Sequence, residues 1–147
     1  PTANEYFVAL MTAIVAADDG ATLADLLYLS DRVVGGVAPA LLRNAFDKVA
    51  ATLQGSLEAL QEVERPPTSA ICRCLSLVGA LLRAQEATAA RWQKPKMLAL
   101  LHLLTSYFDD ARPKVRKAAQ LAVTKLLQHH HALAAKAGDG VTTALTR

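Results

Sequence analysis

Three helical segments of the chain begin at nearly constant intervals, and this spacing limits the possible folds more than any other feature. Their starts near Leu23, Ser69 and Pro113 are 46 and 44 residues apart. Units of about 40–47 residues that each contain two or three helices are typical of stacked helical repeats. The spacing therefore predicts a series of helical hairpins, each packed mainly against its neighbours along the stack.

Each of these helices has a partner, so the chain divides into hairpins. The predicted hairpins and the segment after them are residues 3–34, 39–90, 94–132 and 133–147. Proline suits the first turn of a helix, and Pro39, Pro95 and Pro113 mark predicted helix starts. The last segment is interpreted as a tail or as the start of a further helix. We expect residues 1–147 to form one all-α segment of HEAT or armadillo type, with about three hairpins, from a longer array. A compact helical bundle around one closed core is the alternative fold.

Local signals set the expected helix boundaries. Thr2 or Asn4 is the expected N-cap of the first helix, and Thr22 that of the second. Gly55 is expected to bend or split the long helix that follows Pro39. The helix that begins at Pro95 is expected to carry an apolar stripe of Leu98, Leu101, Leu104 and Phe108.

Composition agrees with closely packed helices and gives no sign of a membrane span, a metal or a cofactor. The chain is 52% hydrophobic but only 5% aromatic, so its core is expected to consist mainly of Ala, Leu and Val. Cys72 and Cys74 are two residues apart in a predicted helix and point to different faces, which argues against a local disulfide or a metal chelate. The longest uncharged apolar stretches, 6–17 and 97–108, are about half of the roughly 20 residues that a membrane-spanning helix needs.

Charge is distributed unevenly along the chain. Residues 1–65 carry four basic and nine acidic side chains, a net charge of −5, whereas residues 66–147 carry 12 basic and four acidic side chains, a net charge of +8. Such a bipolar distribution steers anionic partners towards one end of a molecule. Nucleic acid is the natural candidate, and acidic proteins are the alternative.

The helix that begins at Pro113 divides into two faces on a helical wheel. With about 100° per residue, one narrow arc collects the expected buried seam. The seam consists of Val115, Ala119, Ala122 and Leu126. Lys114, Lys117 and Lys125 lie on the other side, and Arg116 lies at the margin, within reach of a neighbouring hairpin.

The wheel leads to two sets of candidate residues. Asp110 and Arg116 are six residues apart, and this spacing lets a carboxylate in one hairpin meet a guanidinium in the next, as in the ladder of HEAT repeats. The candidate partner-binding residues are Arg112, Lys114, Lys117 and Lys125, with Arg91, Lys94 and Lys96 on the preceding connection. Phosphate contacts by such residues depend on salt and read no base. A merely solvated lysine face is the alternative interpretation.

Signals for catalysis are weak. His129, His130 and His131 are consecutive on a helix end, so they point in three directions, and a frayed, partly exposed terminus is expected rather than a metal site. His102 stands alone in an apolar helix, where a satisfied or partly buried imidazole is expected. The chain contains no P-loop, dinucleotide fingerprint or nucleophile elbow, so we expect no enzyme.

Two stretches resemble a known family. Residues 112–120, RPKVRKAAQ, are similar to a repeat signature of the large HEAT-repeat proteins in the eukaryotic ribosomal-RNA-processing family named for yeast Rrp twelve. Residues 1–11, PTANEYFVALM, resemble the start of the repeat region in those proteins. The first motif occurs in looser form in many HEAT proteins. Residues 85–93 and the tail from Gly138 depart from the family pattern.

The resemblance implies a non-catalytic scaffold for ribosome biogenesis. Such a scaffold binds precursors of the small ribosomal subunit in the nucleolus and nucleus, contacts pre-ribosomal RNA and small-subunit assembly proteins, and follows them during maturation and export to the cytoplasm. It would be part of a large ribonucleoprotein assembly and would need no small-molecule substrate. The alternative is a HEAT adaptor of the transport-receptor or signalling-scaffold type that binds only proteins.

Overall fold

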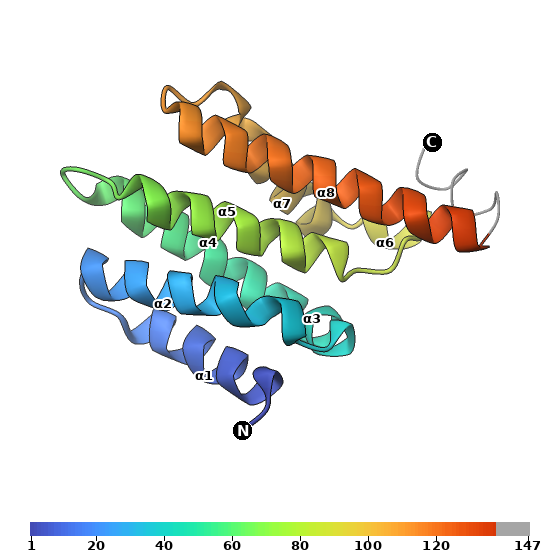
Figure 1. Cartoon of the computed structure of the whole chain (residues 1–147), viewed down its shortest axis with the longest axis horizontal. Coiled ribbons are helices and arrows are strands. Elements are labelled where there is room, and N and C mark those ends of the chain that lie inside the picture. Colours follow the sequence, from blue (N-terminus) through green and yellow to red (C-terminus); the bar gives the residue numbers. More distant parts are fainter. Residues whose placement is uncertain (138–147) are drawn as a thin grey trace.

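Residues 1–137 are described by the computed structural model, and they fold into two layers of helices without any strand (Figure 1). The elements are α1 (Ala3–Ala16), α2 (Gly20–Val33), η1 (Val34–Gly36), α3 (Pro39–Asn44), α4 (Phe46–Glu62), α5 (Thr68–Arg83), α6 (Ala89–Trp92), α7 (Pro95–Thr105), η2 (Ser106–Asp109) and α8 (Pro113–Ala137). Helices α2, α5 and α8 lie side by side in one layer, and α1, α4 and α7 form the other. In this described part, no helix is both long and apolar enough to cross a membrane.

The helices pair into three hairpins that follow one another as a stack. The pairs are α1 with α2, α4 with α5, and α7 with α8. The first and last hairpins lie at opposite edges of the stack (Figure 1), whereas a closed bundle would bring them around one core. The predicted all-α solenoid is therefore confirmed. Helix α8 includes residues 133–137, which were expected to belong to a tail or a further helix, and the rest of that segment, 138–147, lies outside the described residues.

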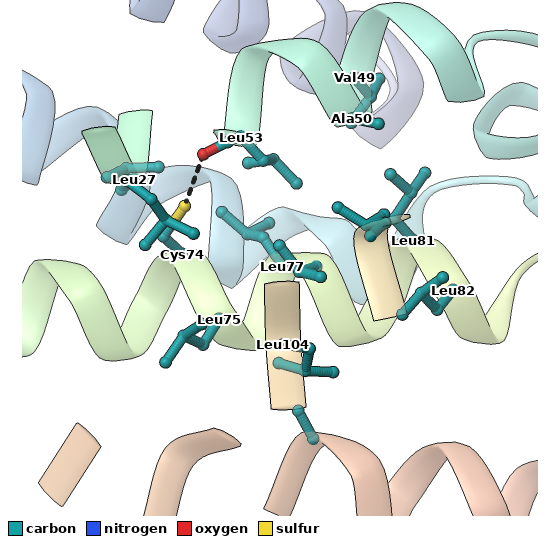
Figure 2. Packing of buried hydrophobic residues seen from close by; sticks show 14 of the residues in the cluster. Leu27, Val49, Ala50, Leu53, Cys74, Leu75, Leu77, Leu81, Leu82 and Leu104 are labelled. Atoms are coloured by element: carbon teal, nitrogen blue, oxygen red, sulfur yellow. Dashed lines mark hydrogen bonds between the residues drawn. The ribbon is translucent and has the colours of Figure 1, made fainter. Parts of the chain in front are cut away.

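Helix α5 is the centre of the stack. Nine of its 16 residues are buried, and it packs against helices of both neighbouring hairpins, α2 and α8 among them. Leu77 and Leu81 of α5 lie among side chains from α2, α4 and α7 (Figure 2). The two cysteines of α5 face different neighbours, as predicted: the Cys72 thiol donates to the Lys114 carbonyl at 3.5 Å, and the Cys74 thiol donates to the Leu53 carbonyl at 3.4 Å.

Small residues bring α5 and α8 into close contact. The predicted seam of α8 is confirmed, because Val115, Ala119, Ala122 and Leu126 are all buried. Gly79 of α5 lies opposite Ala122, and a Cβ placed on Gly79 would come within 3.0 Å of the Ala122 Cβ. A hydrogen at this position therefore lets the two backbones approach closely.

Two helix boundaries differ from the sequence-based expectations. The carboxylate of Asp19 caps α2 by accepting the Thr22 backbone N–H at 2.7 Å, so Asp19 is the N-cap and Thr22 is its partner. The break in the long helix falls at Ala45, whose backbone lies near φ −99° and ψ 15°, and α4 continues through Gly55. At the first helix, Thr2 is confirmed as the cap, in a capping box with Glu5.

The buried face of α7 also differs from the expected stripe. Met97, Leu100 and Leu104 are buried, whereas Leu98 is 49% exposed. The helix ends at Thr105, and Phe108 lies in the following turn η2. The correction arises because nearly every position of α7 is apolar, so its sequence does not reveal which side meets α5.

Candidate anionic-partner interface

A groove with an excess of positive charge runs between α2, α5 and α8. It has a volume of about 420 Å³. Its charged lining residues are Arg73, Arg83, Lys114, Lys125 and one acid, Asp31. Cys72, Ala118, Leu121 and Ala122 supply apolar surface. We call this site the basic groove.

Helix α8 places two of the predicted lysines in the basic groove. Lys114 and Lys125 are eleven residues apart, which is close to three turns, so both lie on one face of the helix. Lys117 is exposed but does not line the groove. The predicted lysine face of α8 therefore has two parts, one turned towards α5 and one away from it.

Helix α5 contributes two arginines to the groove that the sequence analysis did not single out. Arg73 Nη1 lies 3.3 Å from Oδ2 of Asp31 in α2, and the Ser76 hydroxyl donates to Oδ1 of the same carboxylate at 2.8 Å. The Arg73 guanidinium also lies over the ring of Tyr28, 5.0 Å from its centroid. These contacts neutralise Asp31 and join the first two hairpins.

Arg83 has a different environment. Its side chain is partly buried in the groove, and its Nη1 lies 3.5 Å from the position that a Cβ on Gly79 would take. Burial lowers the pKa of the guanidinium, and the Asp31 carboxylate opposes this shift. Among residues 1–137, Arg83 forms no ion pair. It is therefore a partly desolvated cation that faces a groove.

The predicted ladder residues make local contacts among the described residues. The carboxylate of Asp110 accepts two side-chain hydrogen bonds from Arg112, each 2.9 Å long. This bidentate contact with Arg112 lowers the pKa of Asp110 to about 2. Arg116 Nη1 instead donates to the backbone carbonyls of Asp110, at 2.8 Å, and Ala111, at 3.3 Å. Asp110 and Arg116 thus contact each other at the start of α8, within one hairpin. Their role in a ladder between hairpins stays a prediction.

The other predicted basic residues lie apart from the groove, near the start of α7. Arg91 donates to the Gln85 side-chain carbonyl at 2.9 Å and covers the Phe46 ring at 4.6 Å from its centroid. Lys96 pairs with Asp47 at 3.1 Å, and both side chains are mostly exposed. Lys94 is exposed at the N-cap of α7. Sequence reasoning joined these residues to the lysines of α8, but the structure divides them between the two layers.

The histidines also differ from their expected environments. His130 is only 4% exposed and packs edge-on against Trp92, with 5.2 Å between ring centroids, so α8 is anchored at this point rather than frayed. Burial, and secondarily the neighbouring His129, lowers the pKa of His130. His102 is exposed on α7, not partly buried. Within residues 1–137, no three side chains of His, Cys, Asp or Glu are grouped closely enough to hold a metal ion.

A protein-family model and three individual relatives all relate the chain to RRP12-like proteins. The family described as "RRP12-like, N-terminal HEAT repeats" matches residues 1–147. A chicken RRP12-like protein is 34% identical over 127 residues, and a human RRP12-like protein is 33% identical over the same length. A Drosophila melanogaster RRP12-like protein is 26% identical over 126 residues. Each alignment covers 86% of this chain, and the chain spans about a tenth of the length of these relatives. No solved structure matches the chain.

Proposed function

The chain belongs to the family of RRP12-like N-terminal HEAT repeats, and we propose that it is a non-catalytic scaffold segment of a ribosome-biogenesis factor. It would bind precursors of the small ribosomal subunit, with contacts to pre-ribosomal RNA and to small-subunit assembly proteins. Its place of action would be the nucleolus and nucleus, with shuttling to the cytoplasm. No cofactor or small-molecule substrate enters this proposal.

The basic surface of α8 carries the RNA part of the proposal. Lys114, Lys117 and Lys125 are exposed on α8, and none of them forms an ion pair with the described residues. Free lysines bind phosphates by displacing counterions, whatever the base sequence. Arg112 is held by Asp110, so it is expected to position the start of α8 and to contact RNA less than the three lysines do.

Lys94 is the member of the second predicted cluster that forms no ion pair and no side-chain hydrogen bond with the described residues. Arg91 is engaged by Gln85 and Phe46, and Lys96 is paired with Asp47. We propose that this cluster adds a weaker phosphate contact at the edge of the other layer. The exposed Lys96–Asp47 pair is weak enough to exchange for a phosphate, because surface ion pairs contribute about 0–1 kcal/mol.

The second candidate function is a protein-only HEAT adaptor of the transport-receptor or signalling-scaffold type. The apolar lining of the basic groove favours this adaptor function, because apolar surface suits a peptide better than a phosphate backbone. Purification of the tagged full-length protein, followed by sequencing of its RNA and mass spectrometry of its proteins, separates the two functions. Enrichment of small-subunit precursor RNA supports the assembly scaffold. Recovery of proteins without that RNA overturns it in favour of the adaptor.

A further inference from the structure

Arg83 is the cation of the basic groove that is partly buried and forms no ion pair with the described residues. Its guanidinium is held between α5 and α8 beside Gly79, and burial weakens its hydration. A charged group that is partly removed from water and forms no direct ion pair is less favourable than one that is paired. An anion that reaches into the groove would therefore gain more binding free energy from a contact with Arg83 than from a contact with a fully solvated lysine.

The groove combines this cation with apolar surface. Leu121 is 53% exposed and lies on the same face of α8 as Lys114 and Lys125, between the two in sequence. At about 1.5 Å of helix rise per residue, the two lysines are separated along α8 by about 16 Å. Two cationic side chains on α8, Lys114 and Lys125, thus flank the apolar Leu121.

We propose that the basic groove binds an acidic peptide segment of a partner protein, with carboxylates at Arg83, Lys114 and Lys125 and an apolar side chain on Leu121. This proposal rests on the proposed scaffold function in one respect, because it takes the partner protein to be an assembly protein. Three of the four cations of the groove remain in excess after Arg73 is paired with Asp31, which gives charge complementarity to such a segment.

The surroundings of Arg83 in the groove favour a peptide over RNA, whereas Lys114 and Lys125, which also line the groove, are shared with the proposed RNA surface. Grooves that hold single-stranded nucleic acid usually combine basic residues with aromatic rings that are free to stack with bases. The nearby ring, Tyr28, already faces the guanidinium of Arg73 at 5.0 Å, and the groove itself has no aromatic lining residue among those described. The recessed position of Arg83 also suits a single carboxylate side chain better than a phosphate backbone lying across the surface.

Fluorescence anisotropy with a defined peptide tests the proposal. The probe is a labelled helical peptide of about four turns, with glutamates near both ends and leucines between them on one face, so that the glutamates are about 16 Å apart. A second peptide carries glutamine in place of both glutamates. The 147-residue chain is compared with Arg83→Gln and with the control Arg65→Gln, which removes an exposed cation outside the groove.

The chain is expected to bind the glutamate peptide, and Arg83→Gln is expected to weaken this binding about tenfold, as the loss of one charge-assisted contact predicts. Arg65→Gln should change the affinity less than twofold, and the glutamine peptide should bind much more weakly. If circular dichroism shows that Arg83→Gln is misfolded, Lys125→Gln at the exposed side of the groove takes its place. No binding of the glutamate peptide, equal binding of both peptides, or equal effects of the groove and control variants would overturn the proposal.

An oligouridine probe keeps this result separate from the proposed RNA contact. RNA binding that falls with Lys117→Gln but not with Arg83→Gln leaves both proposals standing. Loss of RNA binding with Arg83→Gln, together with displacement of the peptide by oligouridine, would show that the groove is an RNA site and would overturn the peptide proposal alone. Peptide binding without any RNA binding would instead contradict the RNA part of the proposed function.

Discussion

Ser76 of α5 donates a 2.8 Å hydrogen bond to the carboxylate of Asp31 in α2, and this contact helps to join the first two hairpins. The Asp31 side chain is only 15% exposed, and Arg73 shares its carboxylate at 3.3 Å. A carboxylate that is shielded from water depends on such donors, because leaving it unsatisfied costs more than the bond itself contributes. The contact couples the packing of two hairpins to a charge at the edge of the basic groove.

Replacement of Ser76 by Ala should lower the free energy of unfolding by about 1.5 kcal/mol, the scale of a hydrogen bond to a charged group. Ser69→Ala, at an exposed position near the start of the same helix, is the matched control and should have a much smaller effect. Urea unfolding followed by circular dichroism measures both. Equal losses in the two variants would mean that the Ser76 contact does not stabilise the joint between the hairpins.

Replacement of glycine by alanine should change the free energy of unfolding in opposite directions at Gly79 and Gly55. Gly79→Ala places a Cβ 3.0 Å from that of Ala122, so α5 and α8 must separate slightly, and overpacking predicts a loss of about 1 kcal/mol. Gly55 lies in α4 with nothing within 4 Å of its Cβ position. Gly55→Ala should therefore raise the free energy of unfolding by about 0.5–1 kcal/mol through helix propensity. Denaturant titrations that give changes of the same sign at both positions would contradict the close approach at Gly79.

Arg116 should matter more for stability than its neighbour Lys117. The Arg116 guanidinium ties the connection before α8 to the helix through the carbonyls of Asp110 and Ala111, whereas Lys117 is exposed. Arg116→Ala is thus expected to lower Tm by a few degrees, about 1 kcal/mol at the midpoint, and Lys117→Ala by much less. Thermal scans of the two variants provide the comparison. Indistinguishable Tm values would remove Arg116 from any structural role in the stack.

Stability should fall in mildly acidic solution because of His130. Burial lowers the pKa of this imidazole in the folded chain, so the unfolded chain takes up its proton at a higher pH, near the usual value of about 6.5. The folded state then binds fewer protons, and the free energy of unfolding decreases as the pH drops below about 6.5 towards the lowered pKa of the folded state.

The pH dependence can be assigned with two variants. His130→Leu should flatten the decrease in stability between about pH 7 and pH 5. His102→Gln removes an exposed histidine from α7 and should leave the decrease unchanged. If the wild-type chain shows no decrease in this range, or if His130→Leu retains all of it, the buried environment of His130 is not the cause.

The sequence predicted those features that repeat along a single helix. The seam of α8 is visible in its 3.6-residue pattern, and proline correctly marked the starts of α7 and α8. The burial of His130 was not predictable in this way, because Trp92 reaches it from a segment almost 40 residues earlier in the chain. A pattern of one helix contains no information about such a contact.

The basic groove was only half predictable for the same reason. Lys114 and Lys125 are visible on the wheel of α8, but Arg73 and Arg83 come from α5, and Asp31 comes from α2. The available signal was that Arg73 and Arg83 are the only charged residues of α5. The sequence does not show which side of α5 these arginines occupy. It is the packing of α8 against α5 around Gly79 that brings them beside the lysines of α8.

The salt dependence of RNA binding tests the proposed function of the α8 surface most directly. Binding of the chain to a single-stranded RNA is measured at several salt concentrations, alongside a variant in which Lys114, Lys117 and Lys125 are replaced by alanine. A second variant with Lys48→Ala and Arg65→Ala removes exposed cations elsewhere and serves as the control. We expect the triple variant to bind more weakly and the slope of log affinity against log salt to become shallower by about 2, with unchanged helicity by circular dichroism. An affinity and a slope equal to those of the control variant would contradict the assignment of this surface to RNA.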